Sequence, residues 1–349
     1  MNKRLVLVGA GHAHLSVLRT LAAQRTAGVD VVLITPCPQH HYSGMLPGWV
    51  AGHHTQAQCQ IDILPLARAA GVRLVLDQMV SMDAARRCIT LARGQQIEYD
   101  LLSLNVGCET DTSWLEILGD KLLPVKPLDN FFAKWLQILA QAKTQRGYRL
   151  VVVGAGVAGV EMALAAQQAF DTAGTDGRVD LIASESGLLP GHAKSVRARV
   201  QRYAARAGLR LHYLHGVGSE EGVMLSDGSL VPADHVIAAT GARPAVWLAL
   251  SKLAVDAQGY ILVDKYQRSL SHPNVFAAGD VCAQKDNRPR LRSLNLLACG
   301  PRYAVASWGR WSAEGQWVWR WKDWIDRRFI RKFSAAPHTE ATRMMEHTP

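Results

Sequence analysis

The chain has 349 residues, of which 48% are hydrophobic, so it is long enough for two domains with well-buried cores. No run of 18 apolar residues is present, which excludes a membrane-spanning helix. The formal net charge of +10 favours an anionic partner.

The first predicted unit is a strand, a glycine-rich turn and a helix over residues 4–25. Such a turn cradles the pyrophosphate of a dinucleotide: one glycine allows the sharp turn, a second allows close approach, and a third lets helix and strand pack. Gly9 and Gly11 fill the first two roles, whereas His14 stands at the third position. We therefore expect the helix to lie further from its strand, or the imidazole to lie along the cleft.

A second strand is predicted over residues 30–35 and ends at Thr35, where an acidic residue commonly binds the ribose hydroxyls. Thr35 can donate and accept hydrogen bonds but carries no charge. The loop over residues 40–48 is rich in glycine and proline, as loops that line a site often are. Further strands are expected over residues 72–76, 88–92 and 99–107.

A second strand–turn–helix unit begins 145 residues after the first and follows a predicted helix over residues 127–146. Its glycines, Gly154, Gly156 and Gly159, fill all three roles. A lone motif of this kind is weak evidence, but both copies join an apolar strand to an alanine-rich helix, so the sequence predicts two dinucleotides. The next strand ends at Ala183 rather than at an acid, which leaves NADH and NADPH both open.

The elements after the second turn repeat the order of the first half. We expect a strand, an arginine-rich helix, another strand and a tight turn over residues 179–183, 193–207, 209–214 and 227–228. The strand that ends on Gly241 repeats the pattern of the strand that ends on Gly107. A later strand ends in Gly279 and Asp280, which can offer an N–H group to a phosphate and a carboxylate to sugar hydroxyls.

The six cysteines show no CxxC or other close pair, and the first residues lead directly into a strand without a signal peptide. We therefore expect buried or incidental thiols and a cytoplasmic protein. The pairs His40/His41 and His53/His54 lack cysteine or carboxylate partners at ligand spacing, so no metal site is predicted.

The end of the chain combines tryptophan with positive charge. Residues 301–333 hold eight Lys or Arg against three acids, together with six of the ten tryptophans. Indoles and cations together favour the headgroup region of an anionic bilayer, so the segment from Trp308 to Phe333 is a candidate peripheral membrane surface, on the inner face of the membrane. The alternative is a helix that packs its tryptophans on the protein. Nucleic acid also binds basic, aromatic surfaces, but the twin dinucleotide turns argue against it.

Five motifs occur in an order that resembles the two-dinucleotide-binding flavoprotein family: GAGHAH, YDLLSLNVG, GAGVAGVE, AATGARP and FAAGD, within residues 4–282. Residues 42–48, 123–127 and 317–329 are most similar to the NADH dehydrogenase-like module often fused to selenide, water dikinase. More distantly, the chain resembles type II NADH dehydrogenases and sulfide:quinone oxidoreductases. The resemblance implies FAD in the first unit and NAD(P)H in the second.

The resemblance also assigns roles to single residues. It implies that Gly9, Gly11 and Gly107 shape the adenosine side of the FAD site and that Asp280 binds its ribityl or pyrophosphate region. It implies nicotinamide nucleotide contacts at Gly154, Gly156, Gly159 and Gly241. His14, Thr35 and Gly279 are further candidate cofactor contacts, from their places at the first turn and at strand ends. Glu161 matches a carboxylate near the meeting point of nicotinamide and flavin, although an acid near a helix N-terminus is also stabilised by the helix dipole. Lys126 is a candidate for neutralising negative charge on reduced flavin, or is simply a solvated lysine beside prolines.

The chain departs from the family after Asp280. The family usually continues with a helix whose N-terminus faces the flavin ring, and the short segment that follows Asp280 here is expected to lack it. A non-catalytic, regulatory nucleotide-binding protein is therefore an alternative. Another is a sulfide:quinone oxidoreductase-like enzyme, which would need two cysteines converging on the flavin from among Cys108, Cys282 and Cys299.

We predict an α/β protein with two Rossmann-like, doubly wound domains. Residues 1–120 and 245–300 would form a discontinuous FAD domain, residues 121–244 an NAD(P)H domain, and residues 301–349 a Trp/Arg-rich tail. The expected function is an FAD-dependent oxidoreductase that passes hydride from NAD(P)H to the flavin and electrons onward to a quinone or similar acceptor. The sequence leaves the acceptor and the oligomeric state open.

Overall fold

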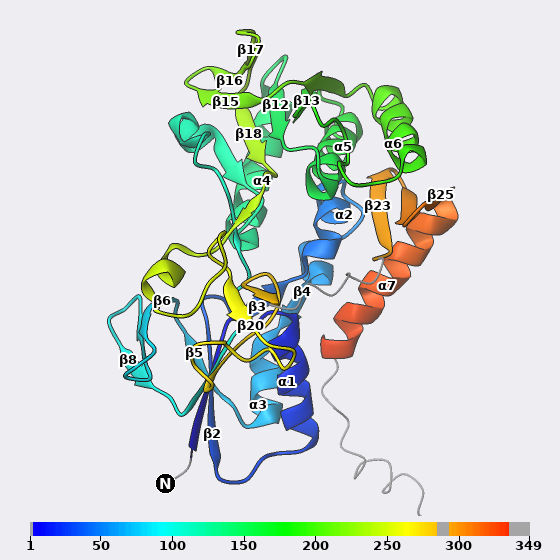
Figure 1. Ribbon diagram of the computed structural model, residues 1–349. Helices are drawn as coiled ribbons and strands as arrows, with labels where there is room; N and C mark the ends of the chain where they lie inside the picture. Colours follow the sequence, from blue (N-terminus) through cyan, green and yellow to red (C-terminus); the bar gives the residue numbers. More distant parts are fainter. Residues whose placement is uncertain (1–2, 285–292, 335–349) are drawn as a thin grey trace, which may run out of the picture.

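The computed structural model describes residues 3–284 and 293–334 and contains two parallel sheets of five strands each (Figure 1). The blue and cyan sheet occupies the lower half of the view and the green sheet the upper half. Helices cover their faces, and the central strands are apolar, as parallel strands buried on both faces must be. The predicted α/β fold with Rossmann-like sheets is confirmed.

The first sheet has the order β21-β9-β1-β2-β5. These strands are Val275–Ala277, Leu101–Leu104, Lys3–Val8, Val29–Thr35 and Arg73–Leu76. Helices α1 (His12–Ala23) and α3 (Ile63–Ala70) pack together beside it. Val8 pairs with Ile34 and Leu104, so the carboxyl ends of β1, β2 and β9 lie level at one edge.

The second sheet has the order β11-β18-β12-β13-β14. These strands are Leu122–Pro124, His235–Ala238, Arg149–Val153, Arg178–Ala183 and Arg210–Tyr213. Its helices are α4 (Leu128–Thr144), α5 (Val157–Thr172) and α6 (Lys194–Arg206). Val153 pairs with Ile182 and Ala238, so the two halves repeat the same arrangement around their central strand.

Several smaller sheets accompany the two main sheets. Two antiparallel three-stranded sheets comprise β6 (Met79–Asp83), β7 (Cys88–Leu91) and β8 (Gln96–Glu98), and β15 (Gly216–Ser219), β16 (Gly222–Leu225) and β17 (Leu230–Pro232). Strand pairs are β3 (Gln39–His41) with β4 (Gln60–Asp62), β10 (Glu109–Thr110) with β19 (Ala242–Arg243), and β20 (Ile261–Val263) with β22 (Cys282–Gln284). The expected strand near residue 88 is β7, which belongs to a separate antiparallel sheet rather than to the first parallel sheet.

The loop that was expected over residues 40–48 is largely ordered into short elements. After β3 come a 3-10 turn, Ser43–Met45, and helix α2 (Leu46–Val50), with Pro47 near its start. Further 3-10 turns are Gln56–Cys59, Glu116–Lys121 and Val246–Leu250. The buried side chains of Met45, Leu46 and Trp49 anchor this segment in the core between the two sheets.

The end of the described chain forms a third unit. Strands β23 (Asn295–Gly300), β24 (Tyr303–Trp308) and β25 (Trp311–Gly315) make an antiparallel sheet, and helix α7 (Gln316–Ser334) follows. Since β23 pairs with β24, this sheet starts before the tail boundary expected at residue 301. Val318, Ile330 and Phe333 of α7 are buried against the body. No helix in the described residues is long and apolar enough to cross a membrane.

Candidate functional site

The first glycine turn is held closely by the end of β9. Gly9 has φ +86°, and a Cβ atom there would collide with the carbonyl oxygen of Asn105. A Cβ atom on Gly11 would collide with the Asn105 side chain. Both positions therefore require glycine, one for its backbone conformation and both for space.

Asn105 joins three segments that the sequence separates. Its Oδ1 accepts hydrogen bonds from the backbone N–H groups of Ala13, at 3.1 Å, and His14, at 3.4 Å, near the start of α1. Its Nδ2 donates to the carbonyl oxygen of Ala278, at 2.6 Å, just after β21. The sequence showed Asn105 only as a variation on a family motif, so its hydrogen bonds to α1 and to Ala278 were not predicted. Asn105 fixes the helix N-terminus that faces the cleft.

His14 does not lie along the cleft, which was one of the two expectations for it. It is only 1% exposed, with Nδ1 at 2.6 Å from the Gly9 carbonyl oxygen and Nε2 at 2.8 Å from the Ser103 hydroxyl oxygen. Burial lowers the pKa of His14 to about 4, so the ring is neutral and one nitrogen donates while the other accepts. His14 thus connects the glycine turn, at Gly9, to Ser103 of β9.

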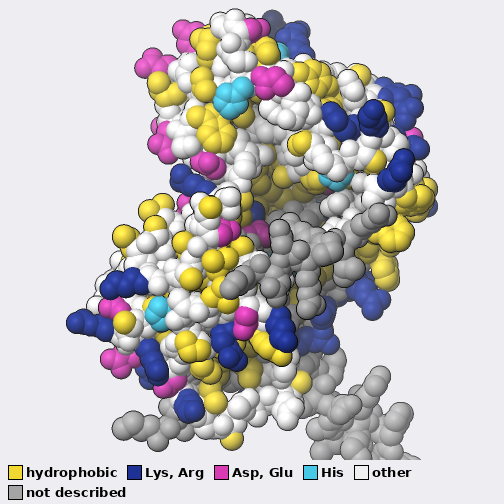
Figure 2. Space-filling model, in the orientation of Figure 1, with side chains coloured by type: hydrophobic (Ala, Val, Ile, Leu, Met, Phe, Trp, Pro, Cys, Tyr) yellow, Lys and Arg dark blue, Asp and Glu magenta, His cyan; other side chains and the backbone are white. Residues whose placement is uncertain are grey.

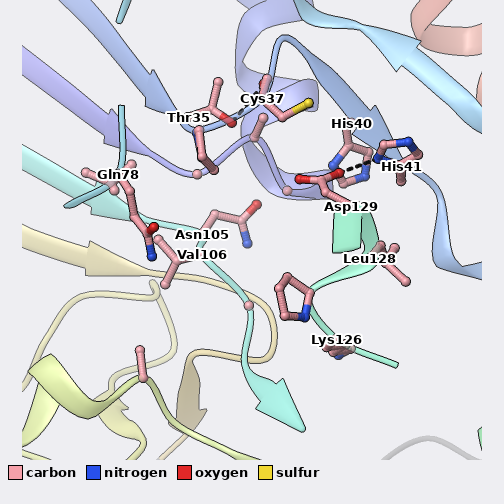
Figure 3. A pocket seen from close by; sticks show the side chains of 18 of the residues that line it. Thr35, Cys37, His40, His41, Gln78, Asn105, Val106, Lys126, Leu128 and Asp129 are labelled. Atoms are coloured by element: carbon pink, nitrogen blue, oxygen red, sulfur yellow. Dashed lines mark hydrogen bonds and ion pairs between the residues drawn. The ribbon is translucent and has the colours of Figure 1, made fainter. Parts of the chain in front are cut away.

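A cleft of about 380 Å³ opens above the turn (Figure 3). Gly9, Gly11, Thr35 and Gly107 line one side, and Lys126 and its neighbours from the second half line the other. The Thr35 hydroxyl donates to the carbonyl oxygen of Cys37 at 3.2 Å and keeps lone pairs for a ligand hydroxyl.

The cleft wall fits an elongated nucleotide in two respects. The N-terminus of α1 faces it, which favours a pyrophosphate. His40 also lines it, and its buried Nε2 has no hydrogen-bond partner within the described residues. Its neighbour His41 instead points toward Asp129, with Nδ1 and a carboxylate oxygen 2.5 Å apart (Figure 3).

Lys126 and Asp280 are brought together from the two halves of the chain. Lys126 Nζ lies 2.9 Å from Asp280 Oδ2 and 3.3 Å from the Cys108 sulfur. Burial would lower the pKa of Lys126, but the hydrogen bond and charge of Asp280 outweigh it and raise the pKa. The same hydrogen bond lowers the pKa of Asp280. Both groups are therefore charged at neutral pH, and Lys126 is a paired rather than a freely solvated lysine.

The second glycine turn has a more open shape. Gly154 has φ +109°, and a Cβ atom there would collide with the carbonyl oxygen of Ala239. A Cβ atom on Gly159 would collide with the Gly154 carbonyl oxygen, so this glycine lets α5 pack against its strand. By contrast, nothing lies within 4 Å of a Cβ atom on Gly156. The space at Gly156 is where a pyrophosphate would approach the backbone.

The remaining glycines mark the ends of strands. Gly241 follows β18, and its carbonyl oxygen accepts a hydrogen bond from the Asp111 N–H at 2.8 Å, next to the β10–β19 pair. Gly279 has φ +80° beside the Asn105 amide. Strand β22 begins at Cys282, two residues after Asp280. Residues 285–292 lie outside the described residues, so the absence of the family's helix from that segment stays a prediction.

Glu161 is almost fully buried one turn into α5. One of its carboxylate oxygens accepts a hydrogen bond from the backbone N–H of Ala298, at 2.7 Å. Burial raises the pKa of Glu161 to about 7, opposed by the charge of Lys322 and by the Ala298 hydrogen bond. Glu161 lies beyond the first turn of α5, which contains no acid. The helix dipole acts mainly within that turn, so it does not explain why an acid is present at this position.

Helix α7 reaches this region with its inner face, which the sequence did not reveal. Lys322 Nζ donates to the Gly44 carbonyl oxygen at 2.6 Å and to Asp326 Oδ2 at 2.8 Å. Asp326 Oδ1 accepts from the Tyr42 hydroxyl at 3.1 Å. The ring of Phe329 lies 4.6 Å from that of Tyr42, centroid to centroid. The tail therefore contacts the segment that carries the cleft wall.

The three candidate cysteines, Cys108, Cys282 and Cys299, do not converge on the cleft, which Cys37 and Cys108 line. All six are unpaired, and Cys108 lines the cleft, whereas Cys299 is fully buried in β23. Cys282 donates to the carbonyl oxygen of Ala277 at 3.3 Å. No group of three or more side chains placed to hold a metal ion is found in residues 3–284 and 293–334.

Comparison with known proteins places this geometry in a family. The family model for pyridine nucleotide-disulphide oxidoreductases matches residues 3–297. The chain belongs to this family. Members of this oxidoreductase family use FAD and NAD(P)H.

Several relatives resemble this family member over most of its length. It is 32% identical to the ferredoxin–NAD(+) reductase component of a biphenyl dioxygenase system of Paraburkholderia xenovorans. The aligned region of 298 residues covers 83% of this chain and 70% of the relative. It is 28% identical over 315 residues to an NADH dehydrogenase-like protein of Mycobacterium tuberculosis, covering 85% and 76%.

Solved structures share the same fold. NDH2 from Plasmodium falciparum in complex with NADH superposes with a TM-score of 0.78 at 13% identity, covering 96% of this chain and 98% of that one. The sulfide:quinone oxidoreductase of Aquifex aeolicus superposes with a TM-score of 0.76 at 16% identity, covering 99% and 95%.

Proposed function

We propose that this oxidoreductase transfers electrons from NAD(P)H through FAD to a quinone or a similar small acceptor. The observation that carries the proposal is the cleft in which the first glycine turn faces Lys126, in a chain that has a second glycine turn of the same kind. The Lys126–Asp280 pair and the buried Glu161 support it. The proposal also takes residues 1–120 and 245–300 as the FAD domain and 121–244 as the NAD(P)H domain. The closer resemblance to the module fused to selenide, water dikinase stays a prediction.

The chain's own groups would position the cofactors. Bound FAD supplies the hydride-accepting and electron-passing chemistry. The N-terminus of α1, fixed by Asn105, would hold the FAD pyrophosphate, and the N-terminus of α5 beside Gly156 would hold that of the nicotinamide nucleotide. Asp280 retains Oδ1 for a hydroxyl of the ribityl chain, since Lys126 uses Oδ2.

Lys126 and Glu161 are the proposed catalytic residues. Lys126 would place a positive charge near the flavin, where negative charge develops on reduction. Glu161, with a pKa of about 7, would hold or release a proton within the operating range. The resemblance to the family implies these roles. The pairing of Lys126 with Asp280 and the burial of Glu161 support them.

A quinone is the first candidate for the acceptor. The half-exposed tryptophans of the tail favour a peripheral membrane surface, and a lipid-soluble quinone would then be within reach. A protein acceptor is the second candidate, because a relative at 32% identity is a ferredoxin reductase component. The sulfide:quinone alternative is less supported, since of Cys108, Cys282 and Cys299 only Cys108 lines the cleft.

Steady-state assays with alternative acceptors would test the proposal. We expect NAD(P)H oxidation with a water-soluble quinone, and its loss in Gly154→Ala, because the new Cβ atom would displace the turn. Gly28→Ala is the matched control: it also has a positive φ, at +74°, but no atom lies within 4 Å of its Cβ position. Turnover with ferredoxin but not with quinone would overturn the quinone assignment, and bound nucleotide without turnover would favour the regulatory alternative.

A further inference from the structure

Helix α7 has an inner and an outer face of different chemistry. Its inner face buries Val318, Ile330 and Phe333 together with the Lys322–Asp326 pair. The outer face leaves the indoles of Trp317, Trp321 and Trp324 partly exposed, at 53%, 37% and 51%. Figure 2 shows yellow apolar side chains beside dark blue cations along the edge formed by β25 and α7.

The charged side chains of α7 also differ from one part of the helix to another. Asp326 pairs with Lys322 at 2.8 Å, and Asp323 pairs with Arg327 at 2.8 Å and lies 3.5 Å from His54. Both acids of the helix thus have a positively charged partner, and both also contact the body of the protein, at Tyr42 and His54. The cations further along the helix have no such partners.

Those cations line a groove between α7 and α1, which lie side by side in Figure 1. Four positive side chains contribute to the groove, and no acid does: Arg19, Arg328, Arg331 and Lys332. None of the four forms an ion pair with a carboxylate in the described part of the chain. Trp324 and Phe329 complete the walls, with the Arg328 guanidinium 5.3 Å from the Trp324 ring centroid. Like charges gathered without counter-ions favour an anionic occupant.

We propose that this groove binds the phosphate of an anionic phospholipid headgroup. Trp324 belongs both to the groove and to the row of exposed indoles, so a phosphate held there would sit beside rings at the depth of the bilayer interface. A soluble phosphate compound would use the cations but would leave the indoles exposed. The inference rests on the proposed peripheral location and adds Arg19 of α1, which lies outside the tail.

The site would link the membrane to the cofactor cleft. Arg19 lies on the helix whose N-terminus faces the cleft, and Phe329 stacks on Tyr42 and lies 4.5 Å from the His12 ring. A headgroup bridging α1 and α7 would therefore hold together the two helices that border the FAD side.

Vesicle co-sedimentation of the FAD-loaded protein is the test. The vesicles contain phosphatidylcholine alone or phosphatidylcholine mixed with phosphatidylglycerol. Each Lys or Arg near an anionic surface contributes about 1 kcal/mol, so Arg328→Gln with Arg331→Gln should weaken binding to the anionic vesicles by about 30-fold. Adding Arg19→Gln should weaken it by about a further fivefold. The matched control, Arg93→Gln with Lys143→Gln, removes two exposed cations elsewhere and should change binding little.

Three outcomes would overturn the proposal. The first is equal binding of the variant and wild type to anionic vesicles, and the second is equal wild-type binding to both vesicle types. The third is saturable binding of inorganic phosphate without binding to the anionic vesicles, which would indicate a site for free phosphate. Flavin absorbance and its bleaching by NAD(P)H serve as the folding check. Because those signals do not depend on lipid, they also separate failure of this site from failure of the proposed function.

Discussion

Replacing Glu161 with glutamine tests the burial of its charge. Burial raises the pKa of Glu161 from 4.5 to about 7. Below about pH 4.5 the carboxyl group is protonated in the folded and the unfolded chain, so its ionisation costs nothing. Between about 4.5 and about 7 the unfolded chain releases a proton that the folded chain keeps, so the free energy of unfolding falls as pH rises.

The size of this loss follows from the two pKa values. Each pH unit between them is worth about 1.4 kcal/mol, so the full loss is about 3 kcal/mol above pH 7. Glutamine carries no charge and can still accept the Ala298 hydrogen bond. Glu161→Gln should therefore raise the free energy of unfolding by up to about 3 kcal/mol at pH 8 and by little at pH 4.5.

Urea unfolding at several pH values would measure the difference. Glu185→Gln is the control, because it removes an exposed carboxylate and should change stability by less than about 0.5 kcal/mol. A stabilisation of the Glu161 variant that did not vary with pH, or a destabilisation at pH 8, would show that the buried charge of Glu161 does not lower the free energy of unfolding. The same variant should also slow flavin reduction by NAD(P)H if Glu161 has its proposed catalytic role.

Three further changes have defined outcomes. Lys322→Met should lower the free energy of unfolding by about 3–5 kcal/mol in urea, because it leaves Asp326 buried without its cation; the double variant with Asp326→Leu should recover part of the loss, and additive losses would contradict the pairing. Asn105→Ala should weaken FAD retention in a gel-filtration assay, since α1 and Ala278 lose their shared partner, and unchanged retention would argue against that tie. Lys126→Met should leave Asp280 unpaired and shift the flavin midpoint potential downward in a dye-equilibration titration, whereas an unchanged potential would remove Lys126 from the flavin environment.

The sequence predicted the parts of the fold that local pattern controls. The helix expected over residues 127–146 is α4, and the arginine-rich helix expected over 193–207 is α6. Both glycine turns lie between a strand and a helix, because the turn geometry is fixed within a few residues. The strand expected near residue 88 exists, but no local pattern indicates that it pairs outside the main sheet.

The tertiary parts of the site were not predictable in this way. The glycine motif predicts the place of His14 from nearby residues alone, whereas its partner Ser103 lies far along the chain. The cluster of Tyr42, Lys322 and Asp326 joins positions about 280 residues apart, which no spacing rule connects. A helix with both acids on its buried side was a usable signal, since buried charges require partners.

The most direct test of the proposed oxidoreductase function is the visible spectrum of the purified protein, recorded without oxygen before and after addition of NADH and then NADPH. We predict flavin bands that either nucleotide bleaches, and recovery of the bands when a quinone is added. A protein that is colourless and cannot be reconstituted with FAD, or one whose flavin neither nucleotide reduces, would contradict the proposed oxidoreductase function.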